Sequence, residues 1–164
     1  MPVIGGENFV TTVFIGDLKK PTLVMTHGFN GSVFLFYKAL QPLKEHFRLI
    51  LFDIIGMGTS SRPAFNLNEP AQVDEYFLSV FESWRSTLNL TDFYLAAHSF
   101  GGYVMGTYAS KHPEHIKKLI LLSPLGVKTR PDNFNVKRMH YPSGYGPPQW
   151  AKGISEKFWG KVNP

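Results

Sequence analysis

Ser99 stands where a short apolar run gives way to a helical pattern, within the segment AHSFGG at residues 97–102. A strand that turns sharply into a helix holds a serine in a strained, outward-facing position. Small neighbouring residues allow the strand and helix backbones to approach each other closely at this turn. Gly101 fills the second glycine of the pattern G-x-S-x-G, while Ala97 replaces the first. We therefore predict that Ser99 is a nucleophile, with His98, Gly101 and Gly102 forming its elbow. The alternative is a serine that only caps the helix.

A second block, HGFNG at residues 27–31, follows an earlier apolar run. Acyl transfer needs two backbone N–H groups aimed at the oxygen that becomes negative. With a nucleophile elbow, these groups come from the residue after the nucleophile and from the loop after an earlier strand. We therefore predict an oxyanion hole made by the amides of Phe29 and Phe100. His27 and Gly28 are assigned to the structure of the turn.

A third block follows the next apolar run and contains Asp53, Gly56 and Gly58. Its glycines suggest a nucleotide site, but a dinucleotide-binding fingerprint would need a third glycine where Ser61 stands. The glycines of the later helix lack the lysine of a phosphate-binding P-loop. We therefore assign Asp53, Gly56 and Gly58 to a structural motif.

Metal and cofactor chemistry have little support in the sequence. The chain has no cysteine, which excludes disulfides, thiolate metal sites and a cysteine nucleophile. His112 and His115 are close in sequence, but Pro113 breaks the helix that would align them. We expect no metal, no organic cofactor and no nucleic-acid partner.

The scaffold that must position these residues is an alternation of buried strands and helices. An opening segment at 9–15, followed by a Gly-Asp turn, predicts a hairpin with the next strand. Ser32 is the expected cap of the first helix. The alternation predicts an α/β fold with a doubly wound, mostly parallel sheet and helices on both faces. The expected strands are 22–26, 47–52, 93–97 and 116–122, and the expected helices are 32–47, 69–88 and 100–111.

The chain divides by composition into a core, residues 1–127, and a basic, Pro/Gly-rich segment, residues 128–164. The core holds 10 Lys/Arg and 10 Asp/Glu, whereas the later segment holds 7 against 2 and therefore carries the whole net charge of +5. Such a basic, aromatic segment can rest on an anionic lipid surface. The alternative is a cap or lid whose charges are simply solvated.

The three blocks, in this order, resemble the α/β-hydrolases, and their details are similar to the abhydrolase-domain 4/5 (CGI-58-like) subgroup. The resemblance rests on residues 27–29, 53–63, 98–103 and 112–127. It implies a serine hydrolase that cleaves ester or amide bonds of lipids such as lysophospholipids or N-acyl phospholipids. Some members carry asparagine at the nucleophile position and regulate lipases, so a non-catalytic lipid-binding protein is the alternative. The subgroup's H-x-x-x-x-D acyltransferase motif is absent: no histidine here has an aspartate five residues later.

The catalytic acid and base are expected beyond these residues. In this fold the triad follows the chain order Ser, acid, His. His112 and His115 lie a whole helix away from Ser99, and His140 has no strand behind it to fix its position. We expect the C-terminal core strands, with the acid and the histidine, beyond Pro164. No apolar run approaches the roughly 18 residues of a membrane span, and no secretory signal opens the chain, so we expect a cytoplasmic protein that is peripheral to membranes or lipid droplets.

Overall fold

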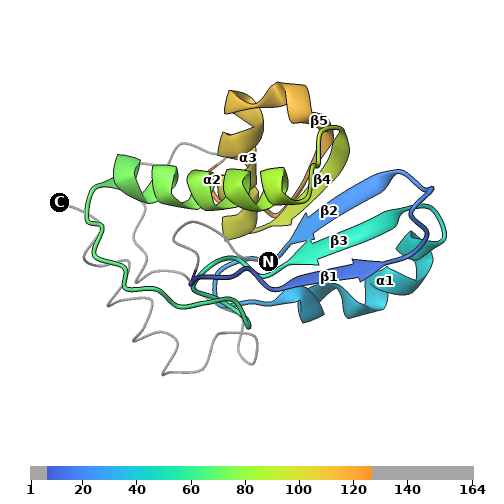
Figure 1. Cartoon of the computed structure of the whole chain (residues 1–164), viewed down its shortest axis with the longest axis horizontal. Coiled ribbons are helices and arrows are strands. Elements are labelled where there is room, and N and C mark those ends of the chain that lie inside the picture. The colour runs from blue at the N-terminus through green and yellow to red at the C-terminus, as the bar shows by residue number, and fades with distance from the viewer. Residues whose placement is uncertain (1–6, 127–164) are drawn as a thin grey trace, which may run out of the picture. The chain divides into compact units, whose positions relative to one another are not determined.

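The computed structural model describes residues 7–126, which form one five-stranded sheet with helices packed on it (Figure 1). The predicted cap segment, residues 128–164, lies outside the described residues, as do residues 1–6. The strands are β1 (Thr12–Ile15), β2 (Thr22–Thr26), β3 (Arg48–Phe52), β4 (Phe93–His98) and β5 (Ile116–Leu122). The helices are η1 (Val33–Phe36), α1 (Tyr37–Lys44), α2 (Pro70–Thr87), α3 (Phe100–Lys111) and η2 (Pro113–His115).

The sheet is mixed, with strand order β1-β3-β2-β4-β5. Strands β3, β2, β4 and β5 are parallel, and β1 runs antiparallel to β3. Thr26 is in register with both Phe52 and Ala97, so β2, β3 and β4 end at the same level. The loops that carry the three sequence blocks therefore begin side by side at the carboxyl ends of these strands. Open α/β sheets bind ligands at this end.

The predicted opening hairpin is wrong. β1 follows the turn that leads to β2, but it pairs with β3, Thr12 facing Phe52 and Ile15 facing Leu49. Both edges of β2 are already occupied by parallel neighbours, β3 and β4. β1 instead takes the outer edge of β3.

Successive side chains of each strand point to opposite faces of the sheet. Both faces are apolar, as is usual for parallel strands that are covered on both sides. Val24, Ile50 and Leu95 pack under α2 and α3. Leu23, Met25, Leu49, Leu51 and Ala96 pack against η1 and α1 on the other face. Helices therefore cover both faces, as the sequence predicted (Figure 1).

Helix α2 begins at Pro70, which suits a first helical position because its fixed φ matches a helix and its missing N–H needs no partner there. Val80, Phe81 and Trp84 are buried on the side of α2 that packs on the sheet. The Trp84 ring packs on Phe52, and its indole N–H donates to Thr12 Oγ1 at 2.9 Å. Val80, Phe81 and Trp84 follow one another at steps of one and three, so they share one face of the helix.

A polar network joins α2 to α3 on the side away from Ser99. Glu82 accepts hydrogen bonds from Arg85 Nε, at 2.8 Å, and from the Tyr108 hydroxyl. Arg85 also donates to the carbonyl of Leu90. The Arg85 guanidinium is the main reason that the pKa of Glu82 falls from 4.5 to about 2.

Glu82 should make the fold sensitive to acid. Its pKa is lower in the folded chain, so its contribution is complete above pH 4.5 and is lost as the pH falls toward 2. About a third of its side chain is exposed, so solvent screening leaves about 1 kcal/mol. We expect Glu82→Gln to lower the free energy of unfolding by that amount at pH 7 and to flatten its decline below pH 4.5 in urea titrations. Glu75→Gln, on the same helix as Glu82, removes an exposed ion pair with Lys111 of α3 and should change neither. Equal pH profiles for the two variants would contradict the assignment.

At the other edge, β5 has no further strand beside it among residues 7–126. Ile120, Leu121 and Leu122 are consequently more than a third exposed. Within the same residues, no helix combines the length and the apolar character needed to cross a bilayer.

Candidate active site

Ser99 occupies a sharp turn between β4 and α3. β4 ends at His98 and α3 begins at Phe100, and between them Ser99 has φ 52° and ψ −116°. A non-glycine residue at positive φ costs on the order of 1–3 kcal/mol, which the surrounding structure must offset. The Ser99 side chain makes no capping hydrogen bond to the helix. The predicted strand–turn–helix arrangement is present, and the interpretation of Ser99 as a simple helix cap is not supported.

The segment after β5 holds this turn in place. The Ser99 N–H donates to Leu122 O, and the Leu125 N–H donates to Ser99 O, each at 3.0 Å. A Cβ at Gly102 would lie 2.8 Å from Pro124 Cβ, so a glycine is needed where the segment crosses α3. Our sequence reasoning missed this role. The available signal was the run SPLG directly after a strand that ends at the same edge of the sheet.

The loop after β2 lies directly against the turn. A Cβ added to Gly28 would lie 2.8 Å from Ser99 Cβ and 3.1 Å from His98 Nδ1. The backbone that leads into Phe29 therefore runs alongside Ser99. Phe100, the next residue after Ser99, begins α3. Among residues 7–126, His98 Nδ1 is buried without a hydrogen-bond partner. The structure thus brings residues 28, 98 and 99 together from two separate blocks of the sequence.

His27 is buried and braces the same loop. Its Nδ1 lies 2.7 Å from Gly28 O, and its Nε2 lies 3.1 Å from the Ile54 amide nitrogen. The carbonyl can only accept and the amide can only donate, so the ring is neutral with its proton on Nδ1. Burial is the main cause that lowers the pKa of His27, against opposing contributions from Gly28 O and Asp53. Both ring nitrogens are engaged with the backbone, so the side chain supports the loop.

Asp53 is buried and ties together segments that are distant in sequence. Its Oδ1 accepts the Val33 N–H at 2.7 Å, and its Oδ2 accepts the Thr59 N–H at 2.8 Å. The first bond caps η1, the role that we predicted for Ser32. Ser32 makes no side-chain capping bond, so that prediction is wrong. The carboxylate supplies the cap from 20 residues away because β3 ends beside the loop that follows β2.

The glycines of the third block allow this arrangement. Gly58 has φ +54°, and a Cβ there would lie 2.2 Å from Asp53 Oδ2. Gly56 has φ +84° with no atom within 4 Å of an added Cβ, so only its backbone conformation requires glycine. Both positions therefore act in the turn, consistent with the structural assignment.

Asp53→Asn should destabilise the fold. An asparagine offers one acceptor oxygen, so in either orientation its NH₂ group faces the Val33 or the Thr59 amide. Leaving a buried N–H unpaired costs about 1–3 kcal/mol, which a shift of the urea midpoint would measure. Asp92→Asn is the matched control, because Asp92 forms an exposed ion pair with Lys117, and exposed pairs contribute little to stability. Equal midpoints for the two variants would contradict the role of Asp53.

His112 and His115 lie at the end of α3 that is far from Ser99. His112 and His115 follow the C-terminal end of α3, which spans 12 residues from Phe100. At about 1.5 Å per helical residue, this end lies on the order of 18 Å from Ser99. A general base must come within about 3 Å of the hydroxyl. Neither residue is part of the cluster around Ser99.

Comparison with protein families supports the fold that this geometry indicates. Residues 21–158 match a family described as alpha/beta hydrolase fold. A crystal structure described as a membrane phospholipase A superposes with a TM-score of 0.70 at 24% identity, covering 80% of this chain and 40% of that one. At this level of identity the superposition shows the fold alone.

Curated relatives include both lipases and acyltransferases. The chain is 37% identical to human (Lyso)-N-acylphosphatidylethanolamine lipase over 96% of its own length and 44% of that protein. It is 41% identical to a probable 1-acylglycerol-3-phosphate O-acyltransferase of Oryza sativa subsp. japonica, covering 76% of this chain and 30% of the relative. Identity to rat 1-acylglycerol-3-phosphate O-acyltransferase ABHD5 is 33%, over 79% of this chain and 37% of the relative.

The chain spans less than half the length of each of these relatives. The resemblance to the abhydrolase-domain 4/5 subgroup is nevertheless confirmed, because relatives of this type match at 33–42% identity. From the sheet order, the turn at Ser99 and the match over residues 21–158, the chain belongs to the α/β hydrolase fold family.

Proposed function

We propose that this chain supplies the nucleophile, Ser99, of a serine hydrolase that cleaves carboxylic ester or amide bonds of lipids such as lysophospholipids or N-acyl phospholipids. The observation that carries the proposal is the backbone of Ser99, held at φ 52° between β4 and α3 against Gly28. The name of the human relative, a (Lyso)-N-acylphosphatidylethanolamine lipase, supports the substrate class. No metal or organic cofactor enters the proposed reaction.

In this mechanism Ser99 Oγ attacks the acyl carbonyl carbon while a general base takes the hydroxyl proton. The carbonyl oxygen becomes negative and is stabilised by the Phe29 and Phe100 amides and by the N-terminal end of α3. The ester or amide bond then breaks, and the leaving group receives the proton from the base. In the second step the base takes a proton from water, whose oxygen attacks the carbonyl carbon of the acyl–Ser99 ester; the bond to Ser99 Oγ breaks, Ser99 regains its proton from the base, and the fatty acid is released.

We expect the general base of this mechanism to lie outside residues 7–126. His27 uses both ring nitrogens in backbone hydrogen bonds. His46 follows α1, at the end of the sheet opposite to Ser99. The proposal therefore requires a histidine and an acid from residues that follow in the chain order Ser, acid, His.

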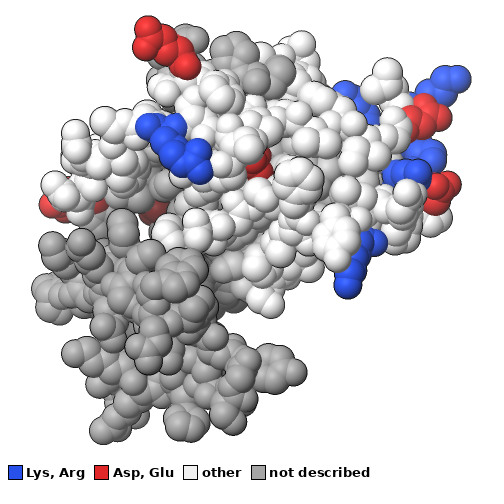
Figure 2. Space-filling model, turned by 90° about the horizontal axis from the view of Figure 1, so that it is seen from below, with Lys and Arg blue, Asp and Glu red and all other residues white. Residues whose placement is uncertain are grey.

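Apolar side chains near the proposed oxyanion loop suit a lipid substrate. The loop after β2, with η1 and the start of α1, exposes Phe29, Phe34, Leu35 and Tyr37. On the side of the molecule on which α1 lies, Figure 2 shows a broad uncharged surface, with a mixed cluster of acidic and basic side chains at its right end and a few charged side chains at the upper left. Exposed apolar surface of this kind commonly marks a binding site. Peripheral contact with a membrane or lipid droplet is part of the proposal.

Acyl transfer to a lipid alcohol is the second candidate, because two of the relatives are named as 1-acylglycerol-3-phosphate O-acyltransferases. The same acyl–Ser99 intermediate would serve both reactions. Only the acceptor in the second step would differ, water in one case and a hydroxyl of 1-acylglycerol-3-phosphate in the other. The H-x-x-x-x-D motif of the subgroup is absent from these 164 residues.

Activity-based labelling tests the proposal. The protein, expressed from its complete coding sequence, is treated with a fluorophosphonate probe and then assayed on lysophospholipid and N-acyl phospholipid micelles. We expect covalent labelling and release of fatty acid. Added 1-acylglycerol-3-phosphate would divert the acyl group into a diacyl product if the protein is an acyltransferase. A protein that is neither labelled nor active would overturn the proposal in favour of a non-catalytic lipid-binding role.

A further inference from the structure

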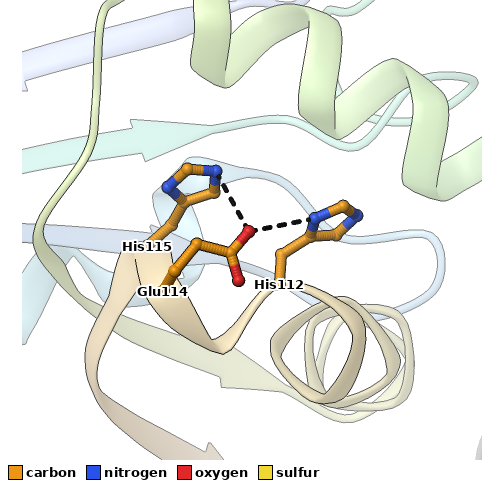
Figure 3. Close-up of side chains that lie close together, drawn as sticks. All are labelled: His112, Glu114 and His115. Carbon is orange, nitrogen blue, oxygen red and sulfur yellow. Dashed lines mark ion pairs between the residues drawn. The ribbon is translucent and has the colours of Figure 1, made fainter.

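Two histidines and a glutamate converge where α3 meets β5, at the end of the helix farthest from Ser99. His112 follows α3, and Glu114 and His115 belong to the short helix η2. The Glu114 carboxylate points between the two imidazole rings (Figure 3). Its Oε1 lies 3.4 Å from His112 Nδ1 and 3.6 Å from His115 Nε2.

These distances match the spacing of metal ligands. Zinc bonds to imidazole nitrogen and carboxylate oxygen of about 2.0–2.2 Å place neighbouring ligands of a tetrahedral site about 3.3–3.6 Å apart. Two edges of the triangle have this length, and all three ligand atoms lie within 4.8 Å of one another. The third edge joins the two histidine nitrogens, and rotation of the side chains would shorten it. The side chains of His112, Glu114 and His115 are 38%, 58% and 21% exposed.

The surroundings favour an incoming cation. The lysines nearest in sequence, Lys111 and Lys117, are each paired with a carboxylate of their own, Glu75 and Asp92. Neither lysine forms an ion pair with Glu114. The His112 ring stacks on Tyr108 with centroids 4.7 Å apart, which holds its plane in position.

We propose that His112, Glu114 and His115 bind a divalent transition-metal ion, with Zn²⁺ as the expected occupant. Imidazole nitrogen selects zinc, copper and nickel over magnesium and calcium. Three protein ligands leave one position for water. The ion joins the end of α3 to the start of β5, and it is separate from the proposed hydrolytic chemistry at Ser99.

This proposal reverses the sequence expectation of no metal site. We expected Pro113 to prevent alignment because it ends the helix. In the structure Pro113 instead opens η2, a 3₁₀ turn that brings Glu114 and His115 back toward His112. A regular α-helix is therefore not needed for these three side chains to meet.

Zinc titration of the full chain, without a polyhistidine tag, tests the site. Competition with a chromophoric chelator is expected to show one zinc ion per chain, and zinc is expected to raise the thermal midpoint. Changes to residues that only orient metal ligands cost about 10–100-fold in affinity. We therefore expect His112→Asn, Glu114→Gln and His115→Gln each to weaken zinc binding by at least about tenfold.

His46→Asn is the matched control, since His46 is exposed and lies outside the cluster. It should leave zinc affinity unchanged. Footprinting of the unmodified chain with diethyl pyrocarbonate needs no variant: zinc should protect His112 and His115 while His46 continues to react. Absence of stoichiometric binding, equal loss in the control, or no protection of the two histidines would each overturn the proposal.

Discussion

Replacing Ser99 by alanine should abolish fluorophosphonate labelling and lower kcat for lipid hydrolysis by at least about 10⁴-fold, because the acyl intermediate can no longer form. The fold should be nearly unaffected. The Ser99 side chain makes no capping bond, so its removal is expected to change the free energy of unfolding by less than about 0.5 kcal/mol. A helix cap would instead lose about 1 kcal/mol on this substitution.

The pair of measurements separates a catalytic serine from a structural one. Ser110→Ala serves as the control, since Ser110 is exposed at the other end of the same helix and bonds only to Thr107 O within the described chain. It should retain full labelling and activity. Full activity in Ser99→Ala, or a stability loss of about 1 kcal/mol without loss of labelling, would refute the proposed nucleophile.

Gly101→Ala should destabilise the protein and disable the site together. A Cβ at Gly101 would lie 2.3 Å from His27 O, so the start of α3 would have to move away from the end of β2. A clash with backbone in a packed core is expected to cost about 3 kcal/mol or more. The same movement separates Ser99 from Gly28. We therefore expect a lower urea midpoint and loss of fluorophosphonate labelling.

Gly106→Ala, in the same helix, is expected to have the opposite sign. No atom lies within 4 Å of a Cβ at Gly106. Alanine in a helix interior is then more stable than glycine by about 0.5–1 kcal/mol. A higher midpoint for Gly106→Ala beside a lower one for Gly101→Ala would show that contact with His27, and not helix propensity, decides the outcome. Similar midpoints would contradict the close approach of α3 to β2.

Much of the fold follows from local sequence patterns. The strand β5 and the helix α3 have the predicted limits, and β2 is the predicted 22–26. These elements are short apolar runs or helical repeats bounded by turn residues, so their identity depends on neighbours in the chain. The elbow at Ser99 belongs to the same class, because its strand, serine and glycines are contiguous.

The errors share a different cause. β1 was expected beside β2 but pairs with β3, and Ser32 was expected to cap a helix that Asp53 caps instead. Each outcome was decided by which segments the fold makes adjacent.

By itself, then, the sequence determined the order and kind of the strands and helices and the residue placed at the elbow, because period, turn chemistry and apolar runs act over a few neighbouring residues. The tertiary structure alone decided that Gly28 lies against Ser99, that the segment after β5 is bonded to the same turn, and that Asp53 caps η1. These contacts arise from the level carboxyl ends of parallel strands. Strand adjacency depends on long-range packing, which local patterns do not encode.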